Sequence, residues 1–155
     1  MRLISGLMLL STCIACAHSL IPGTQVRDTK ANREVYDTLR QLQEALVAKN
    51  TNAAIALAAP EYFETMATPD QNDDYGYAEL RDKVLPDLFA VTGEMQLTFE
   101  VYEIETKDDR AHADVRYHAR AHMKLASGSQ WATGKDFHRI ELVRRDGAWR
   151  ILSGL

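Results

Sequence analysis

The folded part of this sequence has no cysteine, because both cysteines, Cys13 and Cys16, lie close to the N-terminus. A structural disulfide, a zinc–thiolate cluster and a cysteine nucleophile are therefore excluded for the rest of the chain. A net positive charge is also lacking, and charges of both signs are interspersed. The net charge of −4 over 155 residues argues against nucleic acid as a partner, since nucleic-acid binding needs a basic patch. No apolar run reaches the roughly 20 residues that a membrane-spanning helix requires.

What the N-terminus does have is the pattern of an export signal. Arg2 is followed by an apolar stretch over residues 3–10 and then by small residues. We therefore predict a signal peptide over residues 1–15, a short tether over residues 16–28 and one domain over residues 29–155. The chain's length of 155 residues and its 46% hydrophobic content are sufficient for a core.

The cysteine after the apolar stretch resembles a bacterial lipobox, in which the cysteine is lipidated and becomes the new N-terminus. Cys13 and Cys16 are both candidates, and we favour Cys16 because Ala15 supplies the small residue at the strictest position. A plain secretory signal with two incidental cysteines is the alternative. The resemblance implies a lipid-anchored protein on the periplasmic side of a bacterial envelope. The absence of Asp after Cys16 favours the outer membrane.

The first part of the domain has apolar residues at helical spacing. A helix is predicted over 29–49, a short one over 53–59 that ends before Pro60, and a third over 77–92 with a kink at Pro86. The residues predicted to face inward are Val35, Leu39, Leu42 and Leu46 in the first helix, and Leu80, Val84, Leu88 and Val91 in the third.

The second part changes to an alternating pattern. After a short strand within 61–68, we predict antiparallel strands over 95–106, 111–125, 131–144 and 148–153. Asp146-Gly147 is a two-residue hairpin signal between the last two. Phe137 lies on the opposite parity from Ile140 and Leu142, which predicts a bulge near residues 136–139.

Two segments carry a family resemblance. Residues 46–63, LVAKNTNAAIALAAPEYF, are similar to the opening motif of the nuclear transport factor 2-like superfamily, and residues 144–151, RRDGAWRI, resemble its closing hairpin. This superfamily includes ketosteroid isomerase, scytalone dehydratase and the polyketide cyclases of the SnoaL type. The likeness covers residues 29–155, but its motifs describe folding and leave the chemistry open.

The resemblance implies an α+β fold of cone shape, with three N-terminal helices packed on a curved antiparallel sheet of four long strands. Members use the cavity at the wide end for catalysis or for ligands, and many pair through the outer face of the sheet. The expected partners are therefore a small apolar ligand or a protein, with a homodimer through the sheet face as one form. No cofactor is expected, and the lipid anchor is the only expected contact with a membrane.

We favour a non-catalytic binding domain over an enzyme. The alternative is a small-molecule isomerase, dehydratase or cyclase of the ketosteroid isomerase-like type, with a carboxylate or histidine base in the cone. Its candidate catalytic residues are Glu64, Asp136 and His138, because an imidazole close to a carboxylate can transfer protons near neutral pH. The same residues are also typical of rim and surface positions on an alternating strand, and we favour that interpretation.

Three tyrosines are the candidate ligand-binding residues: Tyr62, Tyr75 and Tyr77. Tyrosines that simply pack at a helix start would give the same pattern, and the sequence does not choose between the two interpretations.

No metal site is predicted. His112, His118 and His122 lie on one face of a strand. Residues two apart in a strand are about 6.7 Å apart, so His118 and His122, four apart, are separated by about 13 Å and are too distant to share an ion. We interpret this row, with its neighbouring basic residues, as a solvated outer face. The acidic loop over residues 70–74 lacks the glycine and glutamate positions of a calcium loop.

Overall fold

The computed structural model describes residues 19–65 and 69–155. The predicted signal peptide, with Cys13 and Cys16, lies outside the described residues. Within them no helix is long and apolar enough to cross a membrane. The elements, in chain order, are α1 (Lys30–Val47), α2 (Thr51–Leu57), β1 (Phe63–Glu64), β2 (Tyr75–Gly76), α3 (Tyr77–Glu79), η1 (Leu80–Val84), α4 (Leu85–Val91), β3 (Thr92–Lys107), β4 (Arg110–Leu125), β5 (Gly128–Arg145) and β6 (Ala148–Ser153).

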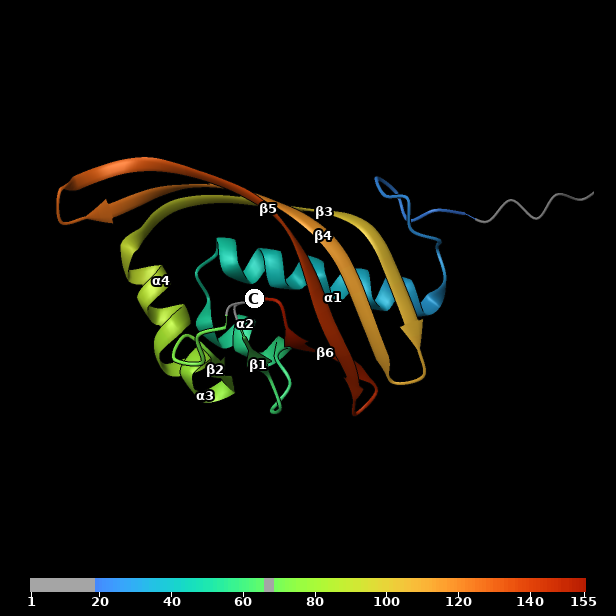
Figure 1. Ribbon diagram of the computed structural model, residues 1–155. Coiled ribbons are helices and arrows are strands. Elements are labelled where there is room, and N and C mark those ends of the chain that lie inside the picture. Colours follow the sequence, from blue (N-terminus) through green and yellow to red (C-terminus); the bar gives the residue numbers. More distant parts are fainter. Residues whose placement is uncertain (1–18, 66–68) are drawn as a thin grey trace, which may run out of the picture.

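The main sheet is antiparallel, with the strand order β3-β4-β5-β6. It curves over α1, and the far ends of β4 and β5 continue as an arm above α4 (Figure 1). The short strand β6 pairs with β5 only over Glu141–Arg145. Helices on the concave side of a curved antiparallel sheet confirm the predicted α+β cone.

The helix ends and the last hairpin follow from local chemistry. Thr29 caps α1 through its hydroxyl, which accepts a hydrogen bond from the Asn32 N–H at 3.1 Å, and Asn50 caps α2 in the same way. Asp146 and Gly147 both have positive φ, +50° and +77°, as a type I′ turn requires. The predicted hairpin is confirmed.

The third helical segment differs from the prediction. A π-helical turn, η1, adds a residue before Pro86, so the inward face shifts by one position. Leu80 is buried, as predicted. Beyond the π-turn Leu85 is buried, whereas Leu88 and Val91 are 41% and 40% exposed. The expectation that Leu88 and Val91 point inward was therefore wrong.

The predicted bulge near residues 136–139 was also wrong. Strands β4 and β5 pair without a break from Leu125 opposite Gly128 to Arg110 opposite Val143. The register shifts lie instead in β3, between Thr92 and Met95 and between Val101 and Glu103, and at the β5–β6 pairing. Phe137 breaks the apolar phase for a different reason, because its ring lies on the outer face and is 59% exposed.

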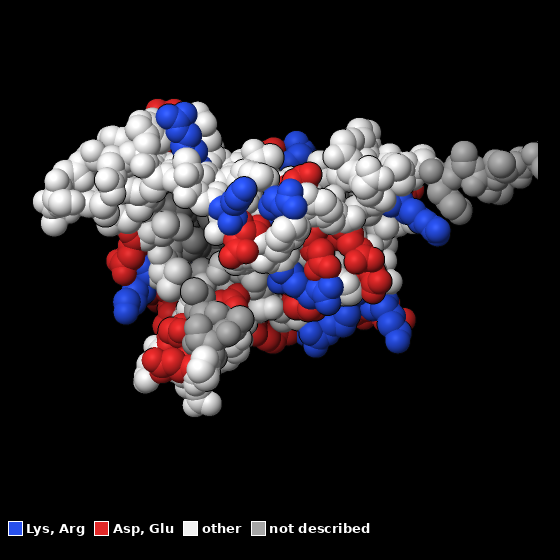
Figure 2. Space-filling view, turned by 45° about the horizontal axis from the view of Figure 1, so that its top comes forward, with Lys and Arg blue, Asp and Glu red and all other residues white. Residues whose placement is uncertain are grey.

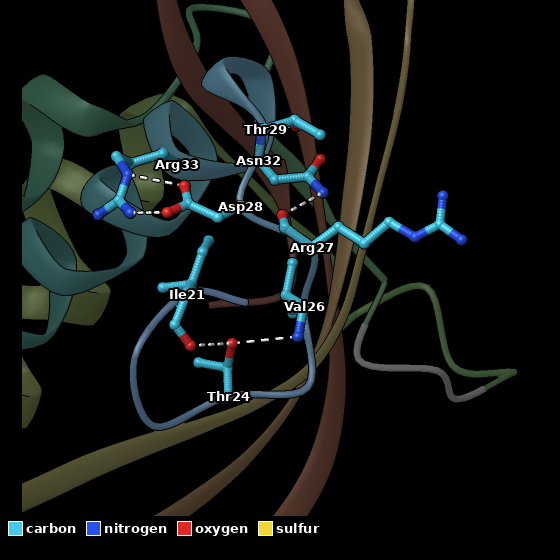
Figure 3. A network of polar contacts seen from close by, with 8 residues as sticks. All are labelled: Ile21, Thr24, Val26, Arg27, Asp28, Thr29, Asn32 and Arg33. Carbon is cyan, nitrogen blue, oxygen red and sulfur yellow. Dashed lines mark hydrogen bonds and ion pairs between the residues drawn. The ribbon is translucent and has the colours of Figure 1, made fainter. Parts of the chain in front are cut away.

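The segment before α1 belongs to the domain. Ile21 and Val26 are 1% and 4% exposed and lie in the core. Figure 3 shows the polar contacts that hold this loop: Thr24 Oγ donates to the Ile21 carbonyl and accepts from the Val26 N–H, and the Asn32 amide donates to the Arg27 carbonyl at 3.0 Å. Two residues of the predicted tether thus pack into the core of the domain, whereas most of its other described residues are exposed.

This packing predicts a matched pair of mutants. Ile21→Ala should lower the free energy of unfolding by about 2–5 kcal/mol, because a buried side chain leaves a cavity. Its near neighbour Leu20 is 46% exposed, so Leu20→Ala should cost less than about 0.5 kcal/mol. Urea unfolding followed by circular dichroism measures both. Equal, small losses would mean that residues 19–28 are only a tether.

Candidate functional site

The inner face of the sheet has two halves with different surroundings. Residues directly opposite one another in neighbouring strands lie on the same face of the sheet. The pairing of the strands therefore identifies the residues on the inner face. Near the β3–β4 turn, inner-face residues are fully buried under α1 and the loop before it, among them Ile104, Ala113, Val115, Ile140 and Leu142. This half is the hydrophobic core.

Towards the arm, the inner face stays apolar but is only partly covered. We call this surface the inner apolar patch, and its half-buried members on β3 and β4 are Met95, Leu97, Phe99, Tyr117, Ala119 and Ala121. On β5 the facing positions are small, Ala132 and Gly134, and Ala132 is exposed. Apolar side chains thus line a concave surface that the helices do not close.

The C-terminal end of α1 fixes the β3 side of this patch. The Gln43 side-chain oxygen accepts a hydrogen bond from the Phe99 N–H at 2.9 Å, and the Lys49 ammonium donates to the Thr92 carbonyl at 3.2 Å. Phe89 of α4 packs against the same core. Strand β3, which carries part of the patch, is therefore held by one residue of α1 and by one residue just after it.

Two of the predicted catalytic residues lie at the edge of the patch. Asp136 is opposite Tyr117 and His138 is opposite Val115, so both are on the inner face, yet both are exposed. The His138 ring meets the Tyr117 ring edge-on at 5.2 Å, and the Asp136 carboxylate accepts from the Phe137 N–H at 2.8 Å. The catalytic role of both residues remains a prediction.

Glu64, the third predicted catalytic residue, takes part in a different cluster. Its carboxylate accepts a hydrogen bond from the Gly154 N–H at 2.6 Å. Gly154 has a φ of +95°, and a Cβ there would lie 2.6 Å from the Arg139 carbonyl oxygen, so only glycine fits. Glu64 thus holds the segment after β6 in place, where Gly154 packs against Arg139 of β5. Arg139 directly follows His138 in the sequence.

The tyrosines of this cluster are held by the protein itself. Tyr75 donates to the Leu155 carbonyl at 2.7 Å, and its ring lies 6.1 Å from that of Tyr62, which is 2% exposed. Burial raises the pKa of both phenols, so they stay protonated and serve as donors. Tyr77 is half-buried against the core. A ligand-binding role for the three tyrosines remains a prediction.

The outer face carries aromatic rings covered by arginines, which sequence reasoning missed. The Arg116 guanidinium lies 4.3 Å from the Phe137 ring centre and 5.1 Å from that of Tyr102, and Arg120 lies 4.3 Å from that of Trp131. Phe137, Trp131 and Tyr102 are 59%, 44% and 37% exposed. The only sequence signal for this cluster was the position of Phe137 on the opposite parity from Ile140 and Leu142, and the same signal was also consistent with a bulge.

The histidine row has separate partners. His112 lies 3.6 Å from Glu105, His118 lies 3.7 Å from Glu100, and the His122 ring packs near Trp131. Beside them, Arg139 donates two hydrogen bonds to Asp114, and this fork lowers the pKa of the Asp114 carboxyl. The row is thus part of a polar outer face, as predicted, and Figure 2 shows acidic and basic side chains intermixed on the side of the domain that it displays.

Comparisons with known proteins agree on the fold. No protein-family model matches the sequence, and no curated protein matches it. Among solved structures, a ketosteroid isomerase-like protein from Erwinia carotovora atroseptica SCRI1043 is 17% identical, with a TM-score of 0.67 over 81% of this chain and 94% of that one. A nuclear transport factor 2-like superfamily protein from Salmonella enterica serovar Typhimurium is 14% identical, with a TM-score of 0.64 over 79% and 86%.

A third neighbour is an enzyme. A type 2 hexachlorocyclohexane dehydrochlorinase is 14% identical, with a TM-score of 0.63 over 80% of this chain and 82% of that one. At such identities the likeness establishes the fold alone. The chain has the nuclear transport factor 2-like fold, and its neighbours of this fold differ in function.

The contacts of Glu64 predict a structural role that can be measured. Glu64→Ala should lower the free energy of unfolding by about 1.5–3 kcal/mol, because the Gly154 N–H loses a charged acceptor. Glu61→Ala is the matched control, since Glu61 forms an exposed ion pair with Arg145 and should matter less. Chemical unfolding of both variants decides. An unchanged stability for Glu64→Ala would remove the structural role.

Proposed function

We propose that this domain binds a small apolar ligand on the inner face of its sheet without transforming it, and that a lipid anchor holds it on the periplasmic side of a bacterial membrane. The observation that carries the proposal is the inner apolar patch. Apolar side chains on a concave face are normally covered by helices, yet here six of them are only half-buried. A ligand that covered them would recover about 25 cal/mol for each Å² removed from water.

The position of the patch fits an anchored protein. Thr29 and Asn32, at the start of α1, line a hollow together with the β3–β4 turn, so the N-terminal side of the domain lies at that end. The arm with the patch extends at the opposite end (Figure 1). If Cys16 is lipidated, the chain from there to the buried Ile21 spans at most about 18 Å. The domain would then sit close to the membrane with its patch directed away from the anchor.

The outer face supports a second candidate, a protein partner. Exposed Trp131, Phe137 and Tyr102, stacked with arginines, are the residue types that dominate binding energy in protein interfaces. A second copy of this chain, paired through the sheet face, is the simplest such partner.

The catalytic alternative rests on the position of two residues. Asp136 and His138 share the inner face with the patch, so a bound ligand could reach a carboxylate and an imidazole. An isomerase, dehydratase or cyclase would require these two groups and Glu64 to converge on the ligand within hydrogen-bond reach. The anchoring of Glu64 to Gly154 favours binding without catalysis.

The binding proposal predicts different effects of substitutions at two adjacent residues. Leu97→Gln, on the inner face, should weaken binding of a fluorescent long-chain polyene fatty acid by about tenfold, because a half-buried leucine is lost from the contact. Thr98→Gln, on the outer face, should leave the affinity unchanged. Fluorescence titration measures both, after circular dichroism has shown that each variant folds. Equal affinities, or no binding by the unaltered protein, would contradict the proposal.

A further inference from the structure

The register shift in β3 brings together three potential metal ligands on the outer face. Val101 pairs with Val115, but after the shift Glu103 pairs with Asp114 and Glu105 with His112. Without the extra residue, Glu103 and Glu105 would point into the core. A β-bulge commonly redirects side chains in this way and is often found next to functional sites.

The resulting cluster is compact. One ligand atom from each of Glu103, Glu105 and His112 lies within 4.8 Å of the others, and His112 Nε2 is 3.6 Å from Glu105 Oε2. Two ligand atoms on a tetrahedral zinc ion are about 3.3 Å apart, given bonds of about 2.0–2.1 Å. Small side-chain rotations would therefore close the three groups around an ion, while the paired strands stay in place.

We propose that Glu103, Glu105 and His112 form a binding site for a divalent transition-metal ion of the zinc type. An imidazole nitrogen with two carboxylate oxygens suits zinc and its neighbours better than magnesium or calcium, which prefer oxygen ligands alone. Three protein ligands leave a coordination position for water or for a ligand group.

The surrounding charges are compatible with a cation. Glu141 is directly opposite His112 on β5, and it lines a hollow together with Glu105 and His112. The nearby Arg139 is engaged by Asp114 through two hydrogen bonds of 2.7 Å, so its charge is already paired. Two basic residues, Lys107 and Arg110, also line this hollow, at the hairpin end where β3 meets β4.

His118 offers a matched control. Like His112, it is an outer-face histidine of β4 with one glutamate at a similar distance, 3.7 Å. It belongs to no group of three ligands among the described residues. Comparing variants of His112 and His118 therefore distinguishes zinc binding at the three-residue site from zinc binding at any histidine–glutamate pair.

The test is calorimetric titration of zinc into the purified chain from Ala17 to Leu155, which lacks both cysteines, after treatment with a chelator. We expect one zinc ion per chain, an affinity about tenfold or more weaker in His112→Gln and in Glu105→Gln, and no change in His118→Gln. Zinc should also raise the melting temperature of the unaltered protein but not of His112→Gln. Glu103→Gln, at an exposed position, provides a third variant should either of the others fail to fold.

The proposal is overturned if the unaltered protein takes up no stoichiometric zinc. It is equally overturned if His118→Gln weakens binding as much as His112→Gln, because zinc would then bind to surface histidines in general. These results are independent of fatty-acid binding, which concerns the other face and the other end of the sheet.

Discussion

The packing of α1 against the inner face of the sheet is the constraint on which the rest of the structure depends. Val35, Leu39 and Leu42 are at most 1% exposed and share one core with Ala113 and Leu142. A sheet with one apolar face must bury that face against another element. Because α1 is straight while the long strands curve away from it, the helix covers the half of the sheet near the β3–β4 turn.

The half of the sheet that α1 does not cover provides the candidate binding surfaces of this domain. Towards the arm, β3 carries half-buried Met95, Leu97 and Phe99 on its inner side, and the far ends of β4 and β5 continue as the arm (Figure 1). From Gly128 to Ile140, β5 has β4 as its only strand partner among the described residues, since β6 pairs only with its last part. A long unpaired edge is a template for another strand unless something restrains it. The arm therefore combines an apolar inner face, an aromatic outer face and an open edge, each suited to a different partner.

The sequence predicted the elements better than their faces. Spacing alone identified α1, the alternating strand β4 and the Asp146-Gly147 turn, because each depends on local preferences. The inward face of α4 depended on a π-turn that moves Leu88 outward, and no local pattern marks such a turn. Phe137 was read as evidence of a bulge, whereas the real shift lies between Val101 and Glu103. Of the candidate site, Asp136 and His138 lie on the inner face because β5 continues without a bulge, which the sequence analysis did not expect. The exposure of the patch was not predictable, because it depends on how far α1 reaches along strands distant in sequence.

These features support a binding protein whose ligand completes the inner face of the arm. The most direct test is native mass spectrometry of the soluble chain from Ala17 to Leu155, purified without detergent, because one spectrum gives both the oligomeric state and any molecule retained by the protein. The account predicts a chain that carries a small apolar molecule, which Leu97→Gln loses and Thr98→Gln retains. A chain free of any adduct, in both the unaltered protein and the variants, would contradict it. A bare dimer would then assign function to the outer face.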